Sequence, residues 1–556
     1  MAGTRLQIVG AFVLFTLIIT PMAWHLTQVE RVDLPVSRIH QLSWQTSRFG
    51  GPDTFQVDIY SLSSSSPAIS LFPLPSSASN VVYVTHHLEL DDQQKEMLQN
   101  SVKLGLQITD DALKTLIPTM DKHFSVFLFC DEKSAGFTPL LMVGKHRHAW
   151  SWQCKVAMGD AVHSAIESLM QNHVYPLVET SVKQNMKTKT ARRALNYRLQ
   201  FSLLKENPVT PWKEDLQTLV DQYLDRFVQK VGAVANFKVE TQVVQFARLA
   251  KEITPSTDGS KFYINAEDLK HFKSANDFFD ASVLEDREQV LHFMAALPDF
   301  VHAPLYIRSA GQKENENALA TSFELPGWGI VVILNSYALN ETFTGDAAAS
   351  VSATKERELQ RVMGLFVSEF RTLLGVPSFW HRQREEEHVA SDDTSRQRLL
   401  FLPSPADGIA DWELDVVMRE RFTNLMQSAI ETLQSTVKLV EALPELSVLE
   451  RVQTRVETAV MRLEDILCDS IQEQQQTCVD ASDLPRLLAM ARQASELTDA
   501  AYYDHTMIRQ LYFPQGQMLG VYAPLLAPLL LPFLLGLIRE MKRFKAKRLA
   551  KTVKSQ

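Results

Sequence analysis

The clearest signal of fold class lies in residues 196–246, which read NYRLQFSLLKENPVTPWKEDLQTLVDQYLDRFVQKVGAVANFKVETQVVQF. Apolar side chains occupy every second position over residues 197–203, and a similar alternation returns from Asn236, as in strands with one buried face. The segment that begins at Trp212 has apolar residues at helical spacing and ends at Gly232, a residue type that caps helices. A strand, a helix and a second strand predict a mixed α/β domain.

Similar elements recur on both sides of this stretch. Short apolar runs with β-branched or aromatic residues, typical of strands, occur at 125–130, 303–309 and 327–336, and a second helical pattern covers 355–375. We therefore expect a continuous α/β domain over residues 28–404.

Helical periodicity replaces the strand patterns in the following segment, residues 405–512. One apolar stripe follows Asp411 and extends over positions 414–440, a second covers 449–467, and a third helix is expected at about 483–503. Three helices with one-sided apolar faces predict a helix bundle. A surface that binds a partner is the alternative.

An apolar run lies near each end of the chain. Residues 516–538 carry no charge, and the roughly 21 residues from Met518 to Ile538, at about 1.5 Å each, match the hydrocarbon thickness of a bilayer. Residues 6–24 form a second run, for which a cleaved signal peptide is the alternative, although no small-residue cleavage site follows it. The basic tail, 539–556, predicts two spans with both termini cytosolic and the large domain on the far side.

Six small or kink-forming residues recur at every fourth position of the second apolar run: Gly516, Gly520, Pro524, Pro528, Pro532 and Gly536. This spacing places them along one helix face. Each proline lacks an N–H, so a carbonyl one turn earlier loses its usual donor, which lipid tails cannot replace. We expect this face to pack against a neighbouring helix; a kinked span that faces lipid and the border of a membrane cavity are the alternatives.

Charge and cysteine content narrow the classes of function. The net charge is −9 at pH 7 although basic residues crowd the C-terminal tail, so nucleic acid is not an expected partner.

In an oxidising lumen Cys130 could pair with Cys154, and Cys468 with Cys478; buried free thiols are the alternative. The sequon at Asn340 predicts a glycan if the domain is lumenal.

No recognised catalytic or metal-binding motif occurs in the sequence. HExxH, GxSxG, GxGxxG, P-loop and metal-binding DxD patterns are absent, and Cys130 and Cys154 sit in no nucleophile signature. The histidines of HH at 86–87 and HRH at 146–148 lack a Cys or acidic partner at ligand spacing, so we predict surface or core positions for them. The sequence therefore assigns no catalytic residue, metal site or cofactor.

Seven segments carry a resemblance to a known family: TQVERVDLPVSRI, FSLLKENP, VANFKVETQVV, HAPLYIRSAGQ, LPGWGIVVILNS, PADGIADWELDVVMRERFTNL and LYFPQGQMLGVYAPLLAPLLLPFLLGL. They resemble the PIG-S family, subunits of the glycosylphosphatidylinositol (GPI) transamidase. Their order and spacing agree along nearly the whole chain, whereas residues 60–155 and 376–402 match poorly.

The resemblance implies a non-catalytic accessory subunit in the endoplasmic reticulum membrane. The complex would replace a proprotein's C-terminal signal with a GPI anchor, using a cysteine and a histidine of the caspase-like subunit PIG-K. Further implied partners are PIG-T, PIG-U and the GAA-type subunit, and contact with the GPI lipid or the proprotein stays open. An independent lumenal enzyme, such as a transferase anchored at both ends, is the alternative. An adhesion or receptor protein is disfavoured by the few cysteines and the lack of repeats.

Overall fold

The computed structural model describes most of the region between residues 32 and 507 and a few helical residues beyond it. The described residues are 10, 32–49, 55–62, 81–116, 123–129, 141–152, 159–175, 196–210, 212, 215–247, 249, 252–272, 288–308, 319–336, 346–376, 399–404, 407–443, 446, 448–467, 483–507, 524, 528, 531, 534–539, 541–543 and 545–546. The chain forms two compact units. The larger consists of Arg48–Thr423 and Asp480–Leu488, and the smaller of Met1–Ser47, Asn424–Val479 and Ala489–Gln556.

The two expected membrane spans fall largely outside the described residues. Of residues 6–24 only Gly10 is described, and of 516–538 only residues 524, 528, 531 and 534–538. None of the helices that the structure describes combines the length and the apolarity needed to cross a membrane.

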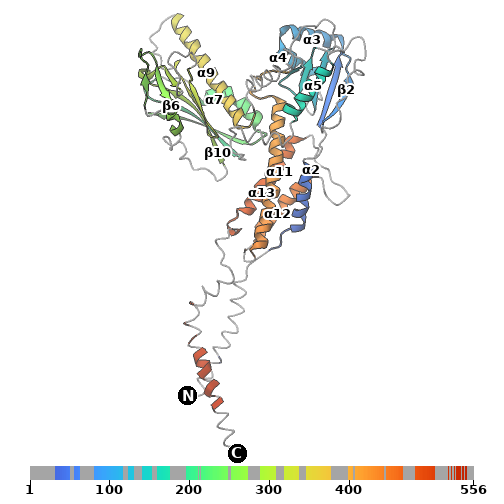
Figure 1. Ribbon diagram of the computed structural model, residues 1–556, viewed down its shortest axis with the longest axis vertical. Coiled ribbons are helices and arrows are strands. Elements are labelled where there is room, and N and C mark those ends of the chain that lie inside the picture. The colour runs from blue at the N-terminus through green and yellow to red at the C-terminus, as the bar shows by residue number, and fades with distance from the viewer. Residues whose placement is uncertain are drawn as a thin grey trace, which may run out of the picture. The chain divides into compact units, whose positions relative to one another are not determined.

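The first sheet of the larger unit has the strand order β14-β4-β5-β3-β1-β2, and all neighbouring strands are parallel except β4 and β5. The strands are β1 (Phe55–Leu62), β2 (Val81–His87), β3 (Phe124–Phe129), β4 (Leu141–Val143), β5 (His148–Ser151) and β14 (Leu399–Phe401). Figure 1 shows the helices beside this sheet, which are α3 (Asp92–Leu104), α4 (Leu106–Leu116) and α5 (Gly159–Leu169), the last continued by the π turn η3 (Met170–Val174). All six residues of β3 are buried, as in an interior strand of a covered sheet, which confirms the strand expected at 125–130.

The second sheet of the larger unit has the order β12-β13-β10-β6-β7, and only the β12–β13 pair is antiparallel. Its strands are β6 (Asn196–Lys205), β7 (Asn236–Gln245), β10 (Glu288–Leu297), β12 (Ser322–Leu325) and β13 (Gly329–Ile333). The helices α7 (Leu216–Val231) and α9 (Asp346–Leu373) pack against each other and lie along this sheet (Figure 1). The strand–helix–strand unit predicted from 196–246 is therefore confirmed as β6, α7 and β7.

A small sheet of order β11-β9-β8 completes the larger unit. It consists of β8 (Thr254–Pro255), β9 (Phe262–Asn265) and β11 (Leu305–Arg308), with the 3₁₀ turns η4 (Asp268–His271) and η6 (Phe300–His302) beside them. Its apolar residues join one core with the second sheet, in which Ile264 and Leu305 contact the cluster around Met294 and Val331.

The prediction that β6 has one exposed face was wrong. Nine of its ten residues are buried, including those at the polar positions of the alternation. Two of these polar groups have partners on neighbouring strands: Arg198 Nη2 lies 2.6 Å from Glu288 Oε2, and Ser202 Oγ accepts a hydrogen bond from Gln242 Nε2 at 2.8 Å. Because β6 lies between β10 and β7, its polar side chains meet those of neighbouring strands instead of water. The edge strand β7 alternates between exposed and half-buried positions only at its two ends, while Val239–Gln242 are all half-buried.

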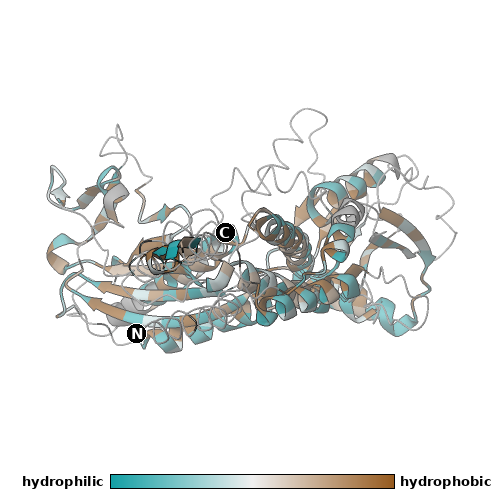
Figure 2. Cartoon of the chain, turned by 90° about the horizontal axis from the view of Figure 1, so that it is seen from below, coloured by the Kyte–Doolittle hydropathy of each residue, from teal (hydrophilic) through white to brown (hydrophobic). Residues whose placement is uncertain are grey.

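The smaller unit is a helix bundle. Its helices are most of α2 (Val36–Phe49), the C-terminal part of α11 (Asp411–Ala442), α12 (Glu450–Leu467) and most of α13 (Leu484–Tyr502), which the 3₁₀ turn η8 (His505–Met507) follows. The buried stripe of α12 consists of Val452, Val456, Ala459, Val460, Leu463 and Ile466. Hydrophilic and hydrophobic residues are interspersed along the helices of the chain (Figure 2), as expected for helices that bury one face and expose the other. The helices expected after residue 410 are confirmed, and their apolar faces are core; α2 was not predicted.

Polar contacts also tie the bundle helices to one another. Arg38 of α2 donates from Nε to Glu464 Oε1 of α12 at 2.9 Å, and Arg455 of α12 donates from Nη1 to the carbonyl of Ala500 on α13 at 2.9 Å. The chain before α2 joins as well, because Val32 N–H donates to the Val448 carbonyl at 3.0 Å. These bonds link segments that are far apart in the sequence.

Candidate functional site

Charged side chains converge on the first turns of α11 inside the larger unit. Three acidic residues begin this helix, and each pairs with a base from another element. We call this cluster the α11 junction; it consists of Asp411, Glu413 and Asp415 with His146, Arg147, Lys230 and Arg371.

The positions of these charges follow from helix electrostatics. Asp411 and Glu413 lie in the first turn of α11, whereas Lys230 and Arg371 lie in the last turns of α7 and α9. Acidic residues are favourable at helix N-termini and basic residues at C-termini, because each compensates the local helix dipole. Three helix ends therefore meet with complementary charge, and the second sheet's helices are joined to α11.

Asp411 links two bases from different parts of the larger unit. Its Oδ2 lies 2.9 Å from His146 Nδ1, in the loop between β4 and β5, and its Oδ1 lies 2.7 Å from Lys230 Nζ. Burial acts to raise the pKa of Asp411, but the hydrogen bonds from His146 and Lys230 outweigh it, so the pKa is lowered overall. The carboxylate is therefore ionised at neutral pH.

We expect the Asp411 contribution to stability to disappear in acid. A folded-state pKa below the unfolded value means that the stabilisation is complete above the ordinary pKa of 3.8 and is lost as pH falls through the folded pKa. Asp411→Asn should thus lower the free energy of unfolding by about 1–3 kcal/mol at pH 7. The difference from the unmodified chain should shrink below pH 4 in urea titrations of the purified full chain. A difference that stays constant between pH 7 and pH 3 would contradict this role.

Glu413 is the most buried acid of the junction, with 5% of its side chain exposed. Arg371 binds it with two hydrogen bonds, Nη2 to Oε1 at 2.8 Å and Nη1 to Oε2 at 3.0 Å. The same Oε2 accepts the N–H of Ala410 at 2.9 Å, and Arg371 Nη1 also donates to the Gly408 carbonyl at 2.6 Å. The pair thus fixes the chain entry into α11 against the end of α9.

The first sheet is attached to α11 through the loop that contains HRH. Arg147 Nη2 lies 2.9 Å from Asp415 Oδ1, the N–H of Asp411 donates to the Lys145 carbonyl at 2.7 Å, and Trp412 Nε1 donates to the Gly144 carbonyl at 3.0 Å. Side-chain and backbone hydrogen bonds therefore both hold the β4–β5 loop against the start of α11.

The two histidines of HRH have different surroundings. His148 is fully buried with its Nε2 2.7 Å from Asp110 Oδ1, and burial lowers its pKa despite the nearby carboxylate. His146 lies between two carboxylates, because its Nε2 is 3.2 Å from Asp111 Oδ1 on α4. The prediction of a core position holds for His148, whereas His146 has acidic partners that sequence spacing did not indicate.

This arrangement suits a structural role better than acid–base catalysis. Both ring nitrogens of His146 contact carboxylates, so neither is left to activate a nucleophile. The carboxylates in turn contact cations, as Asp111 does with Lys145 Nζ at 2.6 Å. Within the described ranges, no group of His, Cys, Asp and Glu side chains is arranged to hold a metal ion.

The site residues predicted from sequence lie mainly elsewhere. Asn340, Cys130, Cys154, Cys468 and Cys478 fall outside the described residues, so glycosylation and the two cysteine pairings stay predictions.

Three of the six positions in the glycine–proline line can be located. Pro524, Pro528 and Gly536 are helical and exposed, whereas Gly516, Gly520 and Pro532 lie outside the described residues. The packing of this face against another helix stays a prediction.

Comparison with known proteins matches the chain to one protein family and to relatives with closely similar names. A family described as "Phosphatidylinositol-glycan biosynthesis class S protein" matches residues 10–547. A Homo sapiens protein named "GPI-anchor transamidase component PIGS" is 22% identical over 538 residues, which cover 91% of this chain and 89% of that protein. A Bos taurus protein of the same name is 24% identical over 342 residues, or 61% of this chain and 56% of the relative. A Schizosaccharomyces pombe "GPI transamidase component PIG-S homolog" is 22% identical over 356 residues, or 64% and 55%. The cattle and yeast matches thus span just over half of those relatives.

Proposed function

Because the chain belongs to the phosphatidylinositol-glycan biosynthesis class S protein family, we propose that it is a non-catalytic accessory subunit of a GPI transamidase. The observation that carries the proposal is the extent of the family match, which runs from residue 10 to residue 547 and includes the three sheets and the bundle. The names of the human and yeast relatives, which are transamidase components, support the same assignment.

The α11 junction supports a scaffolding role. Its charges bind one another across helix ends and loops, and such networks keep elements in one arrangement when each buried charge is paired. A subunit with this construction can present fixed surfaces to partners. The catalytic cysteine and histidine then belong to a separate caspase-like subunit, PIG-K, and PIG-T, PIG-U and the GAA-type subunit are the further partners.

The location that accompanies this function is the endoplasmic reticulum membrane. Residues 6–24 and 516–538 serve as the two spans, both termini face the cytosol, and the domain between them is lumenal. The apolar composition of the two segments and the basic tail 539–556 support this topology. In that lumen Asn340 carries a glycan, the cysteines can pair, and the glycine–proline line contacts a helix of a partner subunit.

Loss of this chain should stop GPI attachment in cells. We expect cells that lack it to retain unprocessed proprotein of a GPI-anchored reporter and to lose at least nine-tenths of the reporter from the surface, because the transamidase would be incomplete. Flow cytometry measures the surface reporter, and a reporter with an ordinary transmembrane anchor serves as the control. Normal reporter levels in the depleted cells would contradict the proposal, as would equal loss of both reporters.

A further inference from the structure

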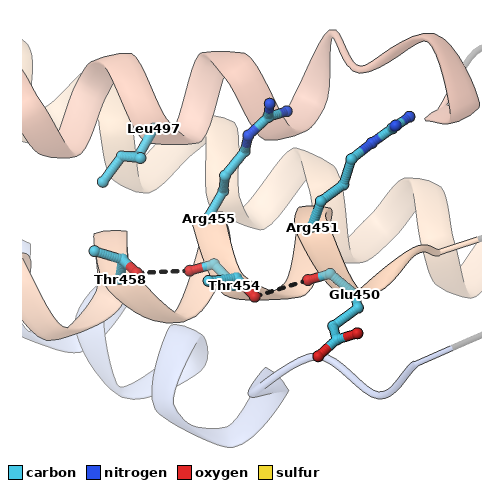
Figure 3. A pocket seen from close by; sticks show the side chains of 6 residues that line it. All are labelled: Glu450, Arg451, Thr454, Arg455, Thr458 and Leu497. Atoms are coloured by element: carbon cyan, nitrogen blue, oxygen red, sulfur yellow. Dashed lines mark hydrogen bonds between the residues drawn. The ribbon is translucent and has the colours of Figure 1, made fainter.

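A groove of about 500 Å³ lies between α12 and α13. Its lining residues are Glu450, Arg451, Thr454, Arg455 and Thr458 of α12 and Leu497 of α13 (Figure 3). Exposed Met461 follows Thr458 by three positions and so continues the same helix face. This face is turned away from the buried stripe that includes Val452, Val456 and Val460. The groove is therefore separate from the bundle core.

Two arginines of the groove share a single carboxylate. Arg451 donates from Nε and Nη2 to Asp504 at 3.0 and 2.8 Å, and Arg455 donates from Nη1 to Asp504 Oδ2 at 3.0 Å. Arg451 Nη2 also lies 3.1 Å from His505 Nε2, whereas Arg451 Nη1 and Arg455 Nε and Nη2 contact no acceptor among the described residues. Two guanidinium groups facing one carboxylate leave one uncompensated positive charge, and about two-fifths of each arginine side chain is exposed.

The remaining polar groups of the groove favour an acidic ligand at the arginine end. The hydroxyls of Thr454 and Thr458 donate to backbone carbonyls one turn earlier, at 2.9 and 2.7 Å, so their hydrogens are already used. Figure 3 shows the Glu450 carboxylate turned away from both guanidinium groups. The unoccupied donors near the groove are thus those of the arginines, which bind carboxylates in the strong, planar geometry that guanidinium groups provide.

Exposed apolar side chains flank this charged centre. Met461 is 48% exposed, Tyr503, beside Asp504, is 72% exposed, and Leu497 forms an apolar wall of the groove. Arginine, tyrosine and methionine are the residue types enriched at protein interfaces. A lipid surface fits less well, because the chain carries a net charge of −9 and the groove's rim includes the acid Glu450.

We propose that this groove is a docking surface for another subunit, which inserts an acidic side chain between Arg451 and Arg455 and rests an apolar neighbour on Leu497 and Met461. The partner is recognised by charge complementarity at the arginines and by apolar contact at the flanks. This proposal rests on the proposed function, because it places the acidic segment on a protein of the transamidase.

The test fills the groove without removing an existing ion pair. Thr454 is exposed and stands between the two arginines along α12, so Thr454→Glu supplies a carboxylate that competes with the partner's acid. The matched control is Ser435→Glu, which adds the same side chain at an exposed position of α11 in the same unit. We expect capture of the tagged full chain from mild-detergent extracts to recover at least fivefold less of one transamidase subunit with Thr454→Glu, and unchanged amounts with Ser435→Glu.

A second readout identifies the occupant directly. Met461 is replaced by photoreactive benzoylphenylalanine in the full chain, and we expect irradiation to attach it to an Asp- or Glu-containing peptide of a co-purified subunit. Adducts with lipid alone, or equal subunit recovery with Thr454→Glu and the unmodified chain, would overturn the docking proposal and leave the proposed function intact. If the unmodified chain recovers no transamidase subunit, the proposed function itself fails and the docking proposal falls with it.

Discussion

Replacing Gly329 with alanine should destabilise the larger unit by about 4 kcal/mol or more. Gly329 begins β13 with a φ of +150° and lies opposite His292 of β10. An added Cβ would stand 1.8 Å from the His292 carbonyl oxygen and 2.7 Å from its carbonyl carbon. Those atoms are backbone and cannot rotate away, so the β10–β13 pairing has to separate.

Urea unfolding of the purified full chain measures this effect, with tryptophan fluorescence as the signal. Trp328 is a suitable reporter because its ring stacks on His292, with centroids 4.2 Å apart. The matched control is Gly364→Ala in the interior of α9, where an added Cβ meets no atom within 4 Å. The control should stabilise the helix by up to about 1 kcal/mol. Equal effects of the two substitutions would show that the close approach at Gly329 is not a constraint.

Replacing Arg371 with methionine should cost about 3–5 kcal/mol, because it leaves the buried Glu413 carboxylate without its guanidinium partner. The substitution should weaken the α11 junction as well as the end of α9, because Arg371 also donates a hydrogen bond to the Gly408 carbonyl. Methionine keeps an unbranched chain that matches the arginine side chain as far as Nε, so the packing of that part is retained. The unfolding midpoint in urea again measures the change.

A double-mutant cycle separates the lost charge pair from lost packing. Glu413→Gln removes the charge but keeps the shape, so the double variant Arg371→Met with Glu413→Gln should be more stable than the sum of the single effects predicts, by at least about 1 kcal/mol. Strict additivity would mean that Arg371 and Glu413 do not stabilise the junction as a pair.

The sequence patterns predicted the helices well, because the spacing of apolar residues and the residues at helix ends depend only on neighbouring positions in the chain. The apolar spacing before Gly232 and Gly375 indicated α7 and α9, and the structure ends both helices within two residues of these glycines. The stripe after Asp411 likewise corresponds to α11, which begins at that residue. The start of α9 was missed, because the segment before Lys355 has a weak apolar pattern and the helix already begins at Asp346.

Features that depend on distant residues were not predictable in this way. The alternation in β6 indicated an exposed face, but its polar positions meet side chains of β7 and β10, such as Glu288. His146 showed no acidic partner at ligand spacing, because its carboxylates come from Asp111, 35 positions earlier, and Asp411, 265 positions later. The one signal that could have indicated the junction is the pattern of helix ends, with acids opening α11 and bases closing α7 and α9.

In the proposed function, this chain is a component, and not the catalyst, of a GPI transamidase. The most direct measurement captures the tagged full chain from membranes in mild detergent and assays the eluate for transfer of a GPI to a proprotein substrate. We expect transfer activity that accompanies a thiol protease subunit, is abolished by thiol alkylation, and disappears when this chain is separated from that subunit. Transfer by the isolated chain, or an eluate without transferase activity and without other subunits, would contradict it.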